Sequence, residues 1–283
     1  AAKLDSTGEL QWNTFLGGWG TENGNGLALD GTGNIYVAGL SGNSWGSPVR
    51  AHEGNYDAFA AMLNNSGALQ WNTFLGGDGS DTGNAIAVSG GNAYVQGRSE
   101  ATWQGASDPE RAYSGSTDAF AARLDGSGVL QWNTFLGSRS ADEGHGIAVD
   151  SSENVYVAGQ SYATWQGDSE PMRPYDSQYD AFAAKLDSSG ALEWNTFLGG
   201  DAHDMGYAIA VSEGGSAHVA GVSWGDWGTP LRAFNVATDA FVVKFAPAGD
   251  AMIWGTFLGG ASGVTACVTL NGSADSIVNA NCR

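Results

Sequence analysis

Two carboxylates recur in each repeat of this chain and could together bind a cation. One acid follows a repeated tryptophan by ten residues, and an aspartate opens each Asp-Ala-Phe segment. Carboxylate oxygens flanked by glycine carbonyls suit Ca²⁺, although no EF-hand ligand spacing is present. The aspartates could equally cap turns by accepting backbone N–H groups. The candidate metal ligands are Glu22, Asp81, Asp142, Asp204, Asp57, Asp118, Asp180 and Asp239.

A second repeated pattern places a tryptophan and an arginine in a long loop. An exposed tryptophan ring could stack on a sugar while the arginine bonds hydroxyls, and copies around a ring would bind glycans multivalently. Alternatively, the tryptophan fills the gap between neighbouring units and the arginine pairs with a carboxylate. The candidate ligand-binding residues are Trp45, Arg50, Trp103, Arg111, Trp165, Arg173, Trp227 and Arg232.

Catalysis is disfavoured because repetition supplies the same residues everywhere, whereas a catalytic site needs different residues in different places. The histidines occupy unrelated positions in their repeats, and none has zinc-ligand spacing. The glycine pair that follows the repeated tryptophan by five residues closes a strand and does not open a phosphate-binding helix. We therefore predict a protein that is not an enzyme and requires no cofactor, with Ca²⁺ as the one candidate ion.

The excess of acidic residues limits the classes of binding partner that this chain can have. Only 14% of residues are charged, yet the formal net charge is −19. Such a surface repels nucleic acid and anionic membranes. The sequence contains no run of eighteen apolar residues, so neither a transmembrane helix nor membrane insertion is expected. The acidity could also serve only to keep a surface rich in glycine and tryptophan soluble. The partners left open are further copies of the chain and surface glycans.

The elements that position these residues follow from one heptapeptide, Trp-Asn-Thr-Phe-Leu-Gly-Gly. Near-identical copies start at Trp12, Trp71, Trp132, Trp194 and Trp254, at intervals of 59, 61, 62 and 60 residues. A constant period near sixty indicates a stack of similar units.

Each unit contains four short apolar segments separated by turn formers, which predicts four antiparallel strands. In chain order we name them A to D, and the landmark heptapeptide forms strand D. Strand A, for example residues 209–212, carries small and β-branched residues on both faces, so we expect it to be innermost and buried on both sides. Four antiparallel strands per repeat are typical of a propeller blade. The acids after the landmark then lie in the D–A loop, and the tryptophan and arginine in the B–C loop.

The two ends of the chain resemble complementary halves of one unit. Residues 1–18 match strands C and D, and residues 261–283 resemble strands A and B. We therefore predict a single all-β domain, a five-bladed β-propeller with one composite blade built from both chain ends. The predicted complete blades are about 19–77, 78–138, 139–200 and 201–260.

The residues also resemble a known repeat family. The stretch 180–187, followed by the heptapeptide at Trp194 and by residues 209–211, is similar to the SBBP (β-propeller) repeat. The family name refers to seven blades, whereas the repeat count here supports five. The resemblance implies exported or surface-attached bacterial or archaeal proteins, and it carries over no catalytic residues.

The cysteines are confined to the last repeat, at Cys267 and Cys282. An even number near one terminus suggests a disulfide and export. Hairpin register would place Cys267 nearer residue 279, so the bond requires a bend in the tail or a second chain.

These observations predict a non-enzymatic extracellular or cell-surface β-propeller that acts as a scaffold, adhesion or assembly module, with Ca²⁺ as a candidate aid. One alternative is a lectin that uses the Trp/Arg loops. The other is a structural subunit of an extracellular polymer, in which the half-blade of one chain completes that of its neighbour.

Overall fold

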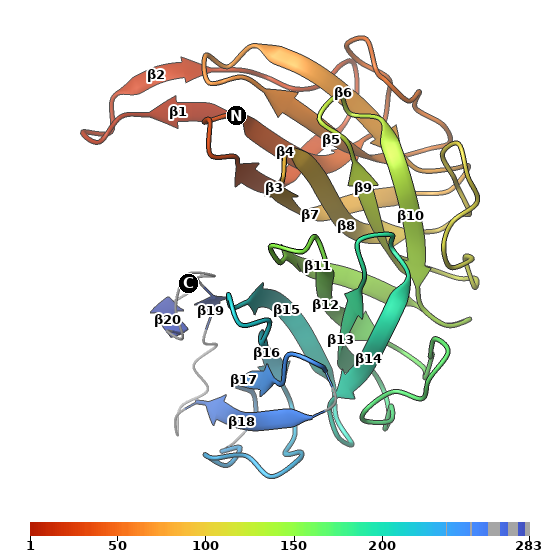
Figure 1. The fold of residues 1–283 in the computed structure, drawn as a ribbon, viewed down its shortest axis with the longest axis vertical. Helices are drawn as coiled ribbons and strands as arrows, with labels where there is room; N and C mark the ends of the chain where they lie inside the picture. Colours follow the sequence, from red (N-terminus) through yellow and green to blue (C-terminus); the bar gives the residue numbers. More distant parts are fainter. Residues whose placement is uncertain (236, 250, 260–266, 271–276, 281–283) are drawn as a thin grey trace.

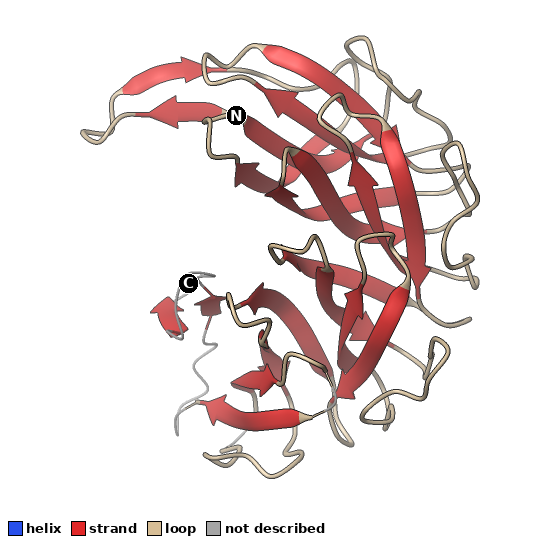
Figure 2. Cartoon of the chain, in the orientation of Figure 1, coloured by secondary structure: helices blue, strands red, loops and turns tan. Residues whose placement is uncertain are grey.

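The fold consists entirely of strands and their connections within the residues described by the computed structural model, which are 1–235, 237–249, 251–259, 267–270 and 277–280 (Figure 2). Short runs rich in valine, alanine and aromatic residues form the strands, and glycine-containing turns separate them. Across these ranges, no helix is long and apolar enough to cross a bilayer.

Four antiparallel four-stranded sheets form the complete blades, and each uses its strands in chain order (Figure 1). Blade 1 contains β3 (Glu22–Leu29), β4 (Ile35–Ser41), β5 (Asp57–Leu63) and β6 (Leu69–Leu75). Blade 2 contains β7 (Asp81–Ser89), β8 (Asn92–Ser99), β9 (Asp118–Leu124) and β10 (Leu130–Leu136). Blade 3 contains β11 (Asp142–Val149), β12 (Val155–Ser161), β13 (Asp180–Leu186) and β14 (Leu192–Leu198). Blade 4 contains β15 (Asp204–Val211), β16 (Ala217–Ser223), β17 (Asp239–Phe245) and β18 (Met252–Leu258).

The remaining strands form two terminal hairpins, β1 (Ala2–Leu4) with β2 (Leu10–Asn13) and β19 (Cys267–Leu270) with β20 (Ile277–Ala280). They supply the C–D and A–B halves of a fifth blade, so the all-β, five-bladed propeller prediction is confirmed. In this structure the hairpins are separate two-stranded sheets at the two ends of the arc of blades (Figure 1). β19 lies against β15 and β16, as each inner strand lies against the preceding blade.

The prediction that strand A is buried on both sides is wrong. Strands B and C are almost completely buried, whereas strand A alternates between buried and partly exposed residues. The reason is position: strand A is the innermost strand and has no further strand on its inner edge, while B and C have a strand on each side and a blade on each face. The sequence also placed the acids of the D–A segment in a loop, but each begins strand A.

The landmark tryptophans hold neighbouring blades together at the outer rim. The indole Nε1 of Trp71 donates to the carbonyl of Gly126 at 3.1 Å, in the C–D turn of the next blade. A Cβ on Gly128 would come within 2.7 Å of the Trp71 ring, and Gly128 also has φ +82°, which favours glycine. Trp132 makes the same contact with the turn at Gly190. One repeated residue therefore joins each blade to the next.

The predicted disulfide lies outside the described residues. Residue 282 is not described, and only the backbone of Cys267 is, in β19, where it pairs with Ala280. The disulfide therefore remains a prediction.

Candidate functional site

The tryptophans of the B–C loops are buried. Trp45, Trp103, Trp165 and Trp227 are between 4% and 8% exposed. Trp103 packs edge-on against Phe120 and Phe135, with ring centroids at 5.2 and 5.7 Å. The landmark Asn133 donates from Nδ2 to the Trp103 carbonyl at 2.9 Å. The loop is thus fixed over its own blade by the phenylalanine and asparagine of the landmark heptapeptide.

The loop arginines join one blade to the next. The Arg50 guanidinium lies 5.8 Å from the ring centroid of Trp103 in blade 2, and Arg111 lies 5.4 Å from that of Trp165 in blade 3. Arg173 continues the series on Trp227 at 5.3 Å. Arg111 also donates to the carbonyls of Phe135 and Gly137, both at 2.9 Å. The cation is therefore held by a ring face and by carbonyl oxygens.

The structure does not give these residues the form of a sugar platform. A platform requires an exposed ring face, but all four indoles are buried, and arginines lie against the rings of Trp103, Trp165 and Trp227. The alternative interpretation agrees with the structure for the tryptophans, which are buried. The arginines mainly meet a ring and carbonyl oxygens, and the carboxylate pair predicted for them is seen for Arg50, with Glu53 at 3.5 Å. Sugar binding by the eight loop residues stays a prediction without an exposed ring to support it.

The repeated acids meet in pairs across the seams between blades. Asp57 begins β5 in blade 1, and Asp81 begins β7 in blade 2; both are fully buried. The N–H of Asp81 donates to the carbonyl of Tyr56 at 2.7 Å, which fixes the two strand ends together. The other complete pairs are Asp118 with Asp142 and Asp180 with Asp204.

A landmark glycine separates the two carboxylates of each pair. A Cβ on Gly137 would lie 2.7 Å from Asp142 Oδ2 and 2.8 Å from Asp118 Oδ1. Asp142 Oδ2 accepts the Ser138 N–H at 2.7 Å, and Asp142 Oδ1 accepts the Ser161 hydroxyl. Asp118 Oδ1 is buried and has no hydrogen-bond partner among the described residues. Each seam therefore holds two close carboxylates and at least one buried carboxylate oxygen that has no hydrogen-bond partner among the described residues.

Burial raises the pKa of these carboxyl groups far above the ordinary value for aspartate. Loss of hydration is the main cause: the pKa is about 7 for Asp57, Asp81, Asp142 and Asp204, and about 6 for Asp118 and Asp180. The second carboxylate adds to the rise, as Asp118 does for Asp142, while Arg111 opposes it at Asp118. One arginine balances one ionised aspartate, so near neutral pH a proton on the other neutralises the seam.

The seams offer few ligands for Ca²⁺, which usually takes six to eight oxygens. Within the described part of the chain, no group of three or more histidine, cysteine, aspartate or glutamate side chains could hold a metal ion. The carbonyl of Gly137 already accepts a bond from Arg111, a competing cation. Ca²⁺ binding by the repeated acids therefore stays a prediction, and the geometry favours a proton.

The acid pattern changes at the ends of the arc. Glu22 begins β3, and its carboxylate accepts bonds from Gly18 N–H and the Ser41 hydroxyl. Asp239 begins β17 and accepts the Asn235 N–H at 2.8 Å, while the repeat-equivalent second position, 264, lies outside the described residues. The structure thus brings six of the eight predicted ligands together in three pairs.

Sequence reasoning missed two groups that shape the seams. In blades 2 and 3 the serine that ends strand B, Ser99 or Ser161, donates to the paired carboxylate, and the first landmark glycine provides the space. Both were visible as invariant positions of the internal repeat. What the sequence did not show is that they meet across a blade boundary.

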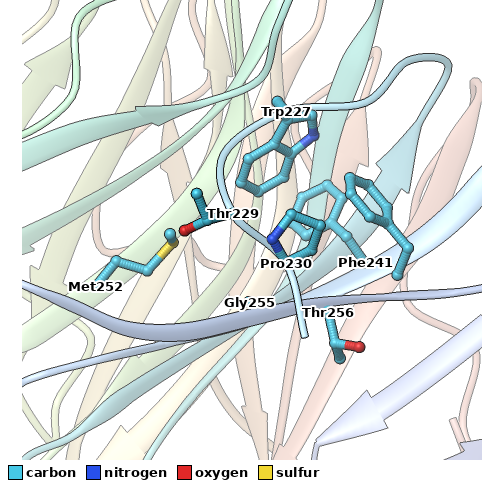
Figure 3. A pocket seen from close by; sticks show the side chains of 8 residues that line it. Trp227, Thr229, Pro230, Phe241, Met252, Gly255 and Thr256 are labelled. Carbon is cyan, nitrogen blue, oxygen red and sulfur yellow. The ribbon is translucent and has the colours of Figure 1, made fainter. Parts of the chain in front are cut away.

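Blade 4 shows what a change in the landmark motif does. Gly255 replaces the asparagine that holds the loop tryptophan in the other blades, and a small pocket lies beside Trp227 (Figure 3). Trp227, Thr229, Met252 and Gly255 line it. A missing side chain accounts for this pocket, so we regard it as a packing gap.

The Gly137→Ala variant is expected to lower the free energy of unfolding by about 2–4 kcal/mol, because the new methyl group meets two buried carboxylates and must displace them. Urea unfolding followed by tryptophan fluorescence measures the change. Gly31→Ala is the matched control, since its Cβ would have no heavy atom within 4 Å. Equal stability of the two variants would contradict the close approach at the seam.

The blades, their order around the arc and their repeated seams define the class of this protein as a β-propeller. The sequence model of the SBBP family, described as a beta-propeller repeat, matches residues 131–164, so the predicted resemblance is confirmed. A solved structure of a protein of unknown function from Bacteroides caccae is similar with a TM-score of 0.48 and 15% identity, over 93% of this chain and 72% of that one. Among curated proteins, none matches.

Proposed function

We propose that this chain is a non-enzymatic extracellular or cell-surface β-propeller that acts as a scaffold and assembly module through an incomplete blade at the end of its arc. The observation that carries the proposal is the exposure of apolar side chains on the N-terminal half-blade and on β3. The equivalent positions of the other blades are buried or partly buried.

Leu27 and Leu4 show the contrast. Leu27 on β3 is 58% exposed, whereas its counterparts Ile86 and Ile209 are 8% and 7% exposed because they pack on strand B of the preceding blade. Leu4 on β1 is 59% exposed, whereas the residues at its position in the four complete blades have no exposed area. Leaving such side chains in water costs about 1.5–3 kcal/mol each, so the half-blade favours a partner.

In the complete blades a landmark tryptophan packs on the glycine of the next C–D turn, and within the described part of the chain the turn of the N-terminal half-blade lacks this contact. Gly8, in the turn between β1 and β2, has φ +86° like the turn glycines that a tryptophan covers. No described heavy atom lies within 4 Å of a Cβ at Gly8. Trp254 on β18 occupies the landmark position of blade 4, so the repeat assigns it to the turn of the following blade.

The occupant that fits is the hairpin of β19 and β20. Its strands occupy the A and B positions of a fifth blade, and β19 already lies against blade 4. β20 would then pair with β1 and cover Leu4 and Leu27. The hairpin can come from the same chain, which closes a ring, or from a neighbouring chain, which builds a polymer. With a net charge of −19, contact between copies requires neutralisation, for which Ca²⁺ is the candidate.

Leu27→Asp is expected to disrupt completion of the blade, because a charge would have to be buried against the incoming strands. Closure within one chain predicts a compact monomer whose Tm falls by about 5 °C or more in the variant, with unchanged mass. Completion between chains predicts assemblies that the variant converts to monomers. Sedimentation velocity, with and without Ca²⁺ and with EDTA, combined with thermal unfolding, distinguishes the two.

Leu231→Asp is the matched control, because Leu231 is 78% exposed on a loop of blade 4. It should change neither mass nor Tm. The assembly proposal fails if Leu27→Asp behaves as this control does.

A further inference from the structure

We infer that four aromatic side chains at the seam between blades 3 and 4 form a binding site for a neutral oligosaccharide. Tyr162 follows β12, Tyr179 precedes β13, His203 precedes β15 and Trp224 follows β16. We call these four residues the aromatic row. It contains none of the buried loop tryptophans, and it is independent of whether the fifth blade is completed.

The aromatic row interrupts the repeat. The corresponding positions at the seam between blades 1 and 2 hold Gly42, Tyr56, Ser80 and Glu100. Between blades 2 and 3 they hold Glu100, Thr117, Ala141 and Tyr162. The backbone connections at these seams are alike, so the fold itself does not require four rings at the third. The four aromatic side chains therefore make the seam between blades 3 and 4 chemically different from the other two seams.

The rings form a continuous series. The centroids of Tyr162 and Tyr179 are 4.9 Å apart, and Tyr179 and His203 are stacked at 4.0 Å with an interplanar angle of 26°. Trp224 meets His203 edge-on at 6.4 Å and 87°. The rings at the two ends are the exposed ones, with Tyr162 at 44% and Trp224 at 40%. The inner pair thus supports two accessible aromatic surfaces.

The backbone holds the row in place. The N–H of Trp224 donates to the His203 carbonyl at 3.0 Å, and the N–H of Asp204 donates to the Tyr179 carbonyl at 2.8 Å. Tyr162 is held in the same way by the Ala141 carbonyl at 3.1 Å. These bonds fix the backbone that carries the rings, and the ring contacts restrict the side chains, so the row loses little conformational entropy on binding, which favours affinity.

The surroundings indicate the chemistry of the ligand. Exposed aromatic faces suit the C–H face of a pyranose, and the tyrosine hydroxyls provide polar contacts for its hydroxyl groups. Gln178 is exposed beside the row and donates to the Asp201 carbonyl at 2.7 Å. The acids in the adjoining loops, Asp176 and Asp201, are exposed and repel an anionic chain. A neutral oligosaccharide therefore fits better than an acidic one.

Binding can be measured by saturation-transfer NMR and isothermal titration with cellohexaose, maltohexaose and chitohexaose as neutral probes and an oligogalacturonate as the anionic probe. At least one neutral probe should bind, and the anionic probe should bind more weakly. Trp224→Ala and Tyr162→Ala should each weaken binding about tenfold, and Trp224→Phe should restore part of the loss. Both residues are exposed, so the thermal unfolding of the variants should match that of the unaltered chain.

Tyr56→Ala is the matched control. Tyr56 is 41% exposed and occupies the position of Tyr179 at a seam without the row, so its loss should leave binding within about twofold of the unaltered chain. The inference is overturned if no neutral probe binds at millimolar concentration, if folded Trp224→Ala binds unchanged, or if Tyr56→Ala weakens binding equally.

Discussion

Trp103→Ala is expected to lower the free energy of unfolding by about 3–5 kcal/mol, the usual cost of deleting a buried tryptophan. The ring is 4% exposed, contacts Phe120 and Phe135, and donates from Nε1 to the Ser99 hydroxyl at 3.1 Å. Its loss also leaves the Arg50 guanidinium without an aromatic face. Because both the loop of blade 2 and the seam with blade 1 depend on this side chain, chemical unfolding should show a large shift in midpoint.

Trp19→Ala is the control for this experiment, because Trp19 is 98% exposed and its removal creates no cavity. Its stability should stay within about 0.5 kcal/mol of the unaltered chain. A stable, folded Trp103→Ala protein that had lost only glycan binding would instead support the lectin alternative drawn from the sequence.

Acidification from pH 8 to pH 5 is expected to stabilise the native protein and raise its Tm by roughly 5–10 °C. The pKa of Asp142 is raised from 3.8 to about 7, and that of Asp118 to about 6. Between about pH 4 and 7 the native state therefore binds more protons than the unfolded chain, so stability falls as the pH rises through the native pKa. Differential scanning calorimetry across this range measures the trend.

Asp142→Asn isolates the contribution of one seam, because the amide imitates the neutral carboxyl group. The variant should be more stable than the unaltered chain at pH 8, and its Tm should change less between pH 8 and pH 5. Asp78→Asn, at an exposed position, is the control for surface charge. An equal change in Tm between pH 8 and pH 5 for the two variants would contradict protonation of the aspartates at the seam.

The same measurement tests the Ca²⁺ prediction. If a proton neutralises the seams, millimolar Ca²⁺ and EDTA should give the same Tm at pH 8. If Ca²⁺ binds there, it should raise the Tm at pH 8, and Asp142→Asn should reduce that effect.

Much of the architecture could be predicted because it depends on local pattern repeated at a constant interval. The landmark tryptophans locate strand D, and the Asp-Ala-Phe segments locate strand C. The match between residues 1–18 and the C–D half of a blade predicted β1 and β2. Burial was less predictable. Strand A has the apolar composition of a buried strand, but its inner edge has no neighbour, which composition does not reveal.

The sequence identified the residues of the candidate site but did not predict how they contact one another. The sequence identified Arg50, Trp103, Asp118 and Asp142 as repeated groups, because recurrence at the same point of each unit is visible in one chain. The sequence did not show whether an arginine contacts the tryptophan of its own unit or of the next. Every unit contains the same residue types, so a contact within a unit and a contact between units look alike in the sequence.

The period, the strand order and the residue types at the seams were thus determined by the sequence alone. The tertiary structure decided that the tryptophans face inward, that the aspartates meet in pairs around Gly137 and its counterparts, and that the aromatic row gathers at a single seam. The physical reason is that each of these contacts joins two blades. Burial and the pKa shifts that follow from it depend on the neighbouring blade, and no single repeat contains that neighbour.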